Sequence, residues 1–179
     1  MGIAGLAALG VQAPITKLSG LVLVETDGCF VDGIEVATGA TIGHRTLRVN
    51  DYGKIAATFV EVSSGTALRL SPKADSRERA RRFAPEAAGR YAAQLEGYRG
   101  LPERELFDFR FVRLSPPVKT LLSRPGLRVI CEECGEEISN GREIAWGRSI
   151  LCQSCAAGGY YVVESRTLMS LQAESIESV

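Results

Sequence analysis

The chain has 179 residues, 45% of them hydrophobic, and its 21 lysine and arginine residues are balanced by 21 aspartate and glutamate residues. A net charge of zero provides no field that would hold nucleic acid or an anionic membrane surface, and this hydrophobic content excludes a largely disordered chain. No apolar run reaches the roughly 18 residues needed to cross a bilayer. The length suits one buried core and a small appendage, so we expect two unequal domains.

The first elements are predicted to be a helix, a strand and a second helix. Four residues at helical spacing share the face of the first helix that we expect to be buried: Ile3, Leu6, Ala7 and Gly10. Residues 21–26 form an apolar run typical of a buried strand, and residues 29–38 have helical spacing up to Gly39. The second helix therefore begins at Cys29, where backbone N–H groups can stabilise a thiolate.

The middle of the chain alternates between turn signals and strand-forming stretches. Three strands of an antiparallel meander are expected there: 41–49, 55–62 and 67–70. Two helices should follow, one capped by Ser76 and ending at residue 83, the other with Pro85 in its first turn and ending at residue 98. Three phenylalanines then alternate with polar residues and predict a half-buried strand: Phe107, Phe109 and Phe111.

Proline-rich segments divide the chain. Ser115-Pro-Pro117 is expected to close the first domain, and Pro125-Gly126 marks the linker, so we predict domains over 1–124 and 125–179. The tail after Ser165 is predicted to be weakly helical with little to bury.

Four of the five cysteines form two Cys-x-x-Cys pairs, Cys131/Cys134 and Cys152/Cys155. Each pair brings two thiolates onto one turn of backbone, and the two pairs can surround one zinc ion at about 2.3 Å per Zn–S bond. Four sulfur ligands leave no open position, so such a site holds structure and does not activate water. Two disulfides, four buried thiols and cysteine-bound iron are the alternatives. Metal-type spacing fits a reducing compartment, so we expect a cytoplasmic protein.

The residues around these cysteines are expected to form a knuckle and hairpins with a small core of Ile138, Trp146 and Ile150. A core of this size cannot fold a domain alone. Metal binding can supply the missing free energy of folding, so chelation should unfold residues 127–163 first.

Cys29 stands apart from the other four cysteines. It is either a small buried residue or a reactive thiol at a helix N-terminus, with ligand-type oxygens nearby on Asp27 and Asp32. His44 is the only histidine, so a histidine-dependent mechanism within one chain would have to use it. The arginines at 77, 79, 81 and 82 spread around a predicted helix and favour a solvated face over a nucleic-acid surface.

Several segments resemble, in order and spacing, the core motif of the FmdE-like family, named after one of the subunits of formylmethanofuran dehydrogenase. They are Glu25-Thr-Asp-Gly-Cys29, Val31-Asp-Gly-Ile34, Thr38-Gly-Ala-Thr41, Gly43 and Asp51-Tyr-Gly-Lys54. The Cys-x-x-Cys-Gly-Glu segment at 131–136, completed by Cys152-x-x-Cys155, is similar to the DksA/TraR-type zinc finger often appended to family members.

This resemblance implies an α+β fold: a mixed β-sheet domain with packed helices, followed by a small C-terminal zinc-ribbon or zinc-finger domain. It implies a homodimer and one structural zinc ion per chain, with these ligands: Cys131, Cys134, Cys152 and Cys155. The first domain would carry a cleft formed by Cys29, Asp27, Asp32, Tyr52 and Lys54. In the parent tungsten or molybdenum complex, which reduces carbon dioxide onto methanofuran, the catalytic metal, pterin and formyl chemistry belong to other subunits.

The chain departs from the family pattern at three points. Members carry an N-terminal His-x-His-x-Cys-Pro element that would complete a second metal or redox site with the cysteine matching Cys29, and this element is absent here. We expect that the start codon was assigned too late or that this member lost the site. Ala40 and His44 stand where the pattern often has cysteine and lysine.

These observations predict a zinc-binding accessory protein without catalysis of its own, acting with a protein partner or with the subunits of an enzyme complex. Two alternatives are open. One is a thiol, redox or metal-dependent enzyme that uses Cys29 with Lys54 as its charge partner. The other is a regulatory module that binds a partner through the zinc finger. Neither nucleic acid nor a membrane is an expected partner.

Overall fold

The computed structural model describes residues 1–122 and 125–162, and the chain divides into two units after Leu122. The tail predicted to be weakly helical lies outside the described residues. Over the described part of the chain, no helix combines the length and the apolar character that a membrane span requires.

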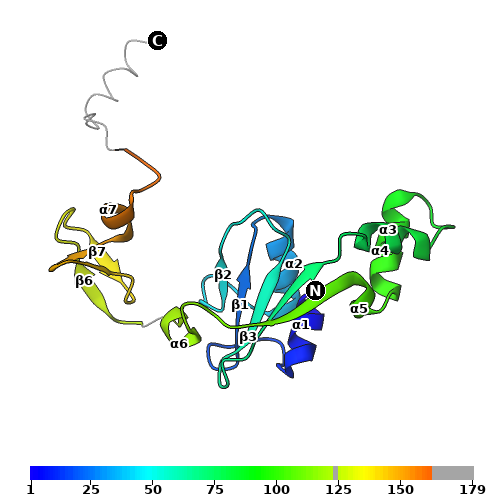
Figure 1. The fold of residues 1–179 in the computed structure, drawn as a ribbon, viewed down its shortest axis with the longest axis horizontal. Helices are drawn as coiled ribbons and strands as arrows, with labels where there is room; N and C mark the ends of the chain where they lie inside the picture. Colours follow the sequence, from blue (N-terminus) through cyan, green and yellow to red (C-terminus); the bar gives the residue numbers. More distant parts are fainter. Residues whose placement is uncertain (123–124, 163–179) are drawn as a thin grey trace, which may run out of the picture. The chain divides into compact units, whose positions relative to one another are not determined.

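The first unit is built on a mixed five-stranded sheet in the order β2-β1-β3-β4-β5 (Figure 1). Its strands are β1 (Gly20–Val24), β2 (Leu47–Val49), β3 (Ala57–Glu61), β4 (Ala67–Pro72) and β5 (Phe107–Val112). β1 and β2 are parallel, and the other neighbours are antiparallel. This mixed sheet with its helices confirms the α+β fold.

The predicted meander is wrong in its first strand. Of residues 41–49 only Leu47–Val49 is extended, and this strand pairs with β1 instead of β3, from Val22↔Leu47 to Val24↔Val49. Residues 42–45 form turns in which Arg45 has φ 62°, and the Thr46 hydroxyl accepts the Thr41 N–H at 3.0 Å. Because a helix connects β1 to β2, the chain returns parallel to β1, and β3 then occupies the other side of β1.

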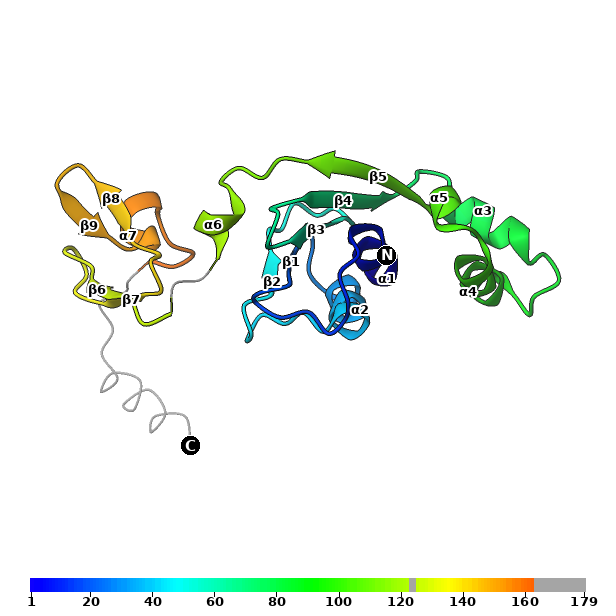
Figure 2. The ribbon, with the colours of Figure 1, turned by 90° about the horizontal axis from the view of Figure 1, so that it is seen from below.

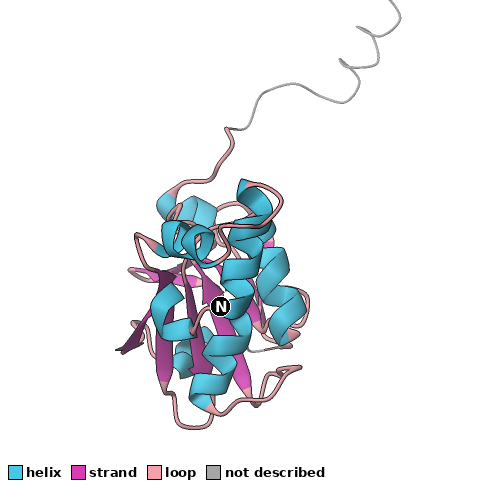
Figure 3. Ribbon diagram, turned by 90° about the vertical axis from the view of Figure 1, so that its right-hand side faces the viewer, coloured by secondary structure: helices cyan, strands magenta, loops and turns pink. Residues whose placement is uncertain are grey.

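Two helices cover one face of the sheet, α1 (Gly2–Leu9) and α2 (Cys29–Thr38) (Figures 2 and 3). α2 begins and ends as predicted, with Gly39 in the left-handed conformation. The face predicted for α1 is wrong, because Ile3 is 71% exposed whereas Gly5 is buried. A Cβ at Gly5 would lie 2.3 Å from the Phe59 ring, so α1 packs on the sheet through Gly5 and through Leu6, the one predicted residue of this face that is buried.

The two faces of the sheet have separate cores. The α1 and α2 face buries, among others, Leu6, Val22, Ile34, Phe59 and Leu70. The opposite face buries Leu21, Leu23, Val60 and Ala67 under a segment that includes the short helix α6 (Val118–Leu121). This alternation along β1 and β3 is the period of two that a strand between two cores requires.

Three helices lie between β4 and β5: α3 (Ser76–Phe83), α4 (Arg90–Gly100) and α5 (Glu103–Leu106). Figure 2 shows them beyond the ends of the two strands. Ser76 is the first helical residue and not the cap, a position that Asp75 occupies. α4 begins at Arg90, five residues later than Pro85 suggested, after Gly89 with φ 104°.

β5 forms where the three phenylalanines predicted a strand, but its burial does not alternate as predicted. Phe109 is 37% exposed and Phe111 is 73% exposed. The reason is position, because β5 is an outer strand of the sheet and pairs only with β4.

Over residues 125–162, the second unit forms two small hairpins and one short helix. β6 (Arg128–Ile130) pairs with β7 (Glu137–Ser139), β8 (Ile144–Trp146) pairs with β9 (Ser149–Leu151), and α7 (Gln153–Ala157) follows. Its buried residues are Cys131, Ile138 and Leu151. The predicted core is therefore correct for Ile138 only, since Trp146 is 62% exposed and Ile150 is 38% exposed. The register places Trp146 and Ile150 on opposite faces of the β8–β9 hairpin, because Trp146 pairs with Ser149 and Ile150 pairs with Ala145.

Candidate functional site

The first cysteine pair is held by a tight turn between β6 and β7. The Cys131 N–H donates to the Glu136 carbonyl at 2.9 Å, and the Gly135 N–H donates to the Cys131 carbonyl at 3.0 Å. Gly135 has φ 74°, a conformation that glycine adopts readily and that lets the chain reverse directly after Cys134. Both side chains of the pair consequently lie on one turn.

The second pair is held by the first turn of α7. Cys152 is the N-cap residue, and its sulfur accepts the Cys155 N–H at 3.4 Å. The Ala156 N–H donates to the Cys152 carbonyl at 3.0 Å, which starts the helix. The cap therefore fixes Cys152 and Cys155 on the same side of the helix start.

The two pairs converge on one point. The sulfur atoms of Cys131, Cys134, Cys152 and Cys155 all lie within 4.8 Å of one another, and those of Cys134 and Cys152 are 3.9 Å apart. A zinc tetrahedron with bonds of about 2.3 Å has sulfur atoms about 3.8 Å apart. A disulfide would need about 2.05 Å, and all four cysteines are free thiols. The geometry fits a four-sulfur metal centre and excludes two disulfides.

The thiol groups of this cluster differ in their pKa values. The Cys134 and Cys152 N–H groups lower the pKa of Cys131 to about 6, while the Ser154 hydroxyl and the Cys155 N–H lower the pKa of Cys152. The hydrogen bond with the Cys152 sulfur raises the pKa of Cys155. Two sulfurs thus lose their protons readily. Four adjacent thiolates repel one another unless a cation lies between them, which is the electrostatic demand that a divalent metal meets.

Cys29 lies elsewhere, at the first residue of α2, and it is exposed. It lines a cavity of about 270 Å³ together with Met1, the start of α1 and one face of α2 from Phe30 to Ala37. The other four residues predicted for the Cys29 cleft do not line this cavity; they are Asp27, Asp32, Tyr52 and Lys54. Tyr52 lines a different cavity of about 330 Å³ with Glu25, Asn50 and Thr58. His44 is exposed in the turn before β2, where its N–H donates to the Thr41 hydroxyl at 3.1 Å.

Glu25 was not predicted as a site residue, yet it organises the motif segments of the first unit. Its carboxylate accepts two hydrogen bonds from Arg69, at 2.5 Å from Nε and 2.7 Å from Nη2, and Arg69 holds the pKa of Glu25 below its ordinary range. The Glu25 carbonyl accepts the N–H groups of Tyr52 and Lys54 at 2.9 and 3.0 Å. An acidic residue directly after a buried strand was the available signal, but its partner in β4 depends on the sheet register.

The comparison with known families settles the family. The model described as "FmdE, Molybdenum formylmethanofuran dehydrogenase operon" matches residues 1–108. The chain belongs to the FmdE family. This match covers the sheet of the first unit as far as the start of β5, together with Cys29, Glu25 and the loop that carries Tyr52 and Lys54.

Two individual proteins are similar to this FmdE-family chain. A protein of Archaeoglobus fulgidus, named a probable S-adenosyl-L-methionine-binding protein, is 28% identical over 100% of this chain and 52% of its own length. The chain thus spans about half the length of that relative. The crystal structure of a tungsten formylmethanofuran dehydrogenase FmdE-like protein from Syntrophus aciditrophicus matches with a TM-score of 0.51 and 21% identity, over 90% of this chain and 82% of that chain. At this identity the likeness concerns the fold.

Proposed function

We propose that this FmdE-family protein is a zinc-binding accessory protein whose second unit is held together by one structural zinc ion. The observation that carries the proposal is the convergence of the Cys131, Cys134, Cys152 and Cys155 sulfurs within 4.8 Å. Four protein ligands leave no position for a substrate or a water, so the ion acts on folding and not on chemistry.

The size of the second unit explains why it needs an ion. Among its described residues the core contains three buried ones, and one of them is Cys131 itself. Units this small rarely fold on apolar burial alone. Structural zinc contributes about 10–16 kcal/mol of apparent binding energy in small metal-dependent modules, which is enough to decide whether such a unit folds.

The accessory role and the partners rest on the family. We propose that the protein is cytoplasmic and acts as a homodimer or beside the subunits of an enzyme complex, with domains 1–124 and 125–179. The exposed Phe109 and Phe111 on the outer strand β5 support a protein partner, because exposed aromatic residues on a sheet edge favour association.

A second candidate function is thiol chemistry at Cys29. The observation in its favour is that Cys29 is exposed at the start of a ten-residue helix and lines a cavity. Lys54, the lysine expected as the charge partner of Cys29, does not line this cavity. Alkylation of Cys29 measured against pH tests this function, because titration near the free-cysteine value of about 8.5 argues against a reactive thiol.

Metal content and chelation test the zinc proposal. We expect one zinc and no iron per chain by elemental analysis, and loss of the metal in Cys131→Ser and Cys152→Ser. Cys29→Ser is the matched control and should keep it. Trp146, the only tryptophan, lies in β8 and reports on this unit by fluorescence.

A chelator should shift the Trp146 emission and remove amide protection over 127–162, while β1 and β3 stay protected. Unchanged protection in the chelated second unit would refute a structural role for the metal. Stoichiometric iron would refute zinc.

A further inference from the structure

One large cavity of the first unit has no assigned role. It has a volume of about 600 Å³ and lies where the end of β4, the start of α3 and the end of α5 meet α1 and α2. Small-molecule sites typically measure about 300–1,000 Å³ and are mostly apolar with a few converging polar groups. The cavity shares Met1 and Phe30 with the smaller Cys29 cavity, but Cys29 does not line it.

The wall of this cavity is largely aromatic and aliphatic. Phe30 from α2, Tyr98 from α4 and Phe107 from β5 contribute rings, and Ile55 and Leu106 contribute aliphatic surface. Tyr98 and Ile55 are 41% and 46% exposed, so their apolar surface is available in the described structure. Such a wall suits a flat, apolar ligand body that can stack on rings.

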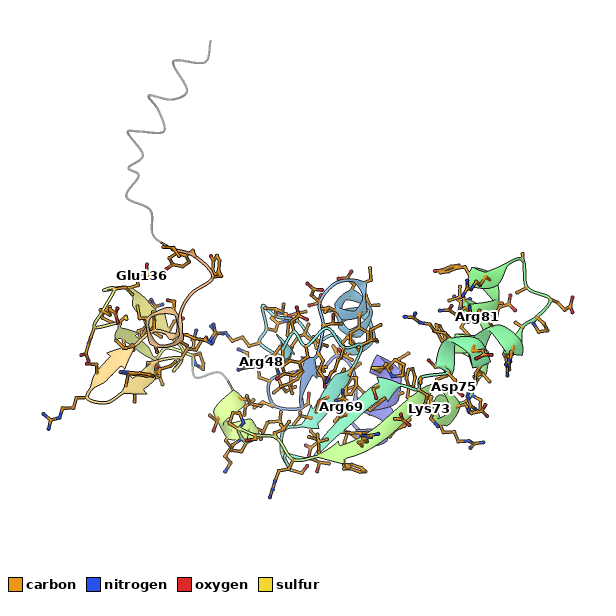
Figure 4. All side chains as sticks on the ribbon, turned by 45° about the horizontal axis from the view of Figure 1, so that its top comes forward. Arg48, Arg69, Lys73, Asp75, Arg81 and Glu136 are labelled. Atoms are coloured by element: carbon orange, nitrogen blue, oxygen red, sulfur yellow. The ribbon has the colours of Figure 1, made fainter. Side chains whose placement is uncertain are left out.

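One end of the cavity carries positive charge. Lys73 and Arg77 line it, and among the described residues neither forms a salt bridge. Figure 4 shows Lys73 where β4 passes into α3. Asp75 and Glu103 are nearby opposing charges, but neither lines the cavity, and Arg79 binds the Asp75 carboxylate at 2.6 Å.

Ser76 supplies an independent indication of a ligand. The residue is 4% exposed and lines the cavity, and its hydroxyl has no hydrogen-bond partner within the described chain. Among the described residues, every fully buried side-chain oxygen or nitrogen has a hydrogen-bond partner. The Ser76 hydroxyl has none, so it is not fully buried, and Ser76 lines the cavity. Ser76 is also the first residue of the eight-residue helix α3, whose unpaired N–H groups and dipole favour an anion.

We propose that this cavity binds a small aromatic anion, with its ring body against Phe30, Tyr98 and Phe107 and its carboxylate or phosphate against Lys73, Ser76 and Arg77. The combination of an aromatic wall with two cations and a free hydroxyl at one end accounts for both parts of the ligand. The site does not use the zinc cluster or the Cys29 thiol, so it stands independently of the function proposed above.

Calorimetric titration of the full chain in its metal-bound form tests this site with two probes, adenosine 5′-monophosphate and 2-naphthoate. We expect saturable one-site binding that weakens with added salt. A preference for the first probe identifies a phosphate ligand, and a preference for the second identifies a carboxylate ligand. Lys73→Ala and Arg77→Ala should each weaken binding about tenfold, the loss expected for a hydrogen bond to a charged group.

Ser76→Ala should weaken binding less, since it removes a neutral hydrogen bond. Arg81→Ala is the matched control, because Arg81 is on the same helix but does not line the cavity, and it should bind as the unaltered protein does. The proposal is overturned if neither probe binds saturably, or if the Lys73→Ala/Arg77→Ala double variant binds equally well. It is also overturned if a second copy of the chain proves to fill the cavity, seen as amide protection there that depends on protein concentration.

Discussion

Gly97 is the residue of α4 that contacts the backbone of α3. A Cβ built at this position would lie 2.0 Å from the Ala80 carbonyl oxygen and 2.4 Å from the Ala80 Cα, whereas ordinary contact begins at 3.4 Å. These neighbours are backbone atoms, so no side-chain rotation can relieve the clash. In Gly97→Ala the two helices would have to separate by about 1.4 Å, the difference between 3.4 and 2.0 Å.

Gly97→Ala should change the stability in the direction opposite to that expected from helix propensity. Alanine in a helix interior is favoured over glycine by about 1 kcal/mol, while overpacking costs about 1–3 kcal/mol and separated helices lose further contact. We expect Gly97→Ala to destabilise the α3–α4 pair by about 1–2 kcal/mol net. Gly33→Ala is the control, because Gly33 is inside α2 with no atom within 4 Å of the added Cβ, and it should stabilise by about 0.5–1 kcal/mol.

Hydrogen exchange of residues 29–38 and 76–100, with urea unfolding followed by circular dichroism, separates the two effects. Gly97→Ala should speed exchange in α3 and α4, and Gly33→Ala should slow exchange in α2. A Gly97→Ala protein that is as stable as the unaltered chain, or more stable, would refute the close packing of these helices.

Two further substitutions test buried polar contacts. Glu25→Gln breaks the ion pair with Arg69, whose side chains are only 13% and 26% exposed, and should cost about 1–2 kcal/mol at neutral pH after allowance for solvent screening. Arg69 lowers the pKa of Glu25 from its ordinary value of 4.5. The stability that this ion pair contributes is therefore present above pH 4.5 and is lost as the pH falls through the lower pKa of the folded state. The unfolding free energies of the unaltered protein and Glu25→Gln, measured in urea, should consequently converge in acid. Thr38 is fully buried, and its hydroxyl donates to the Ile34 carbonyl at 2.7 Å and accepts the Ala40 N–H at 3.1 Å. Thr38→Val should therefore lower the unfolding free energy by about 1–3 kcal/mol, whereas the exposed Thr120→Val should change it by less than about 0.5 kcal/mol; equal effects would contradict the role of the buried hydroxyl.

The elements that were predicted well are those whose signals are local. α2 runs from Cys29 to Thr38 because helical spacing and a left-handed Gly39 are both visible in the chain. The β3–β4 hairpin was predicted for the same reason, since its turn residues separate two apolar runs. The Cys-x-x-Cys spacing likewise indicated the sulfur cluster, because each pair needs only one turn of backbone to bring its thiols together.

The elements that were predicted poorly depend on partners far along the chain. The pairing of β2 with β1 follows from the crossover through α2, and no local pattern distinguishes this arrangement from a meander. The buried face of α1 is chosen by the Phe59 ring, and the exposure of Phe111 follows from the outer place of β5. Of the residues expected in one cleft, Cys29 and Tyr52 line separate cavities, since motif residues in sequence order need not share a surface.

The sequence by itself determined the α+β class, the bounds of α2, the family and the four cysteines whose sulfur atoms cluster, since each of these follows from short-range spacing. Only the tertiary structure decided which strands are neighbours, that Glu25 is paired with Arg69, and that Lys73, Ser76 and Arg77 share a cavity with the rings of Phe30 and Tyr98. Glu25 and Arg69 are 44 positions apart, and Phe30 and Tyr98 lie far along the chain from the segment that contains Lys73, Ser76 and Arg77. They come together only when burial of apolar surface sets the sheet register and the packing of α3, α4 and α5. The hydrophobic effect is not directional, so no single segment of the sequence shows which partners it will bring together.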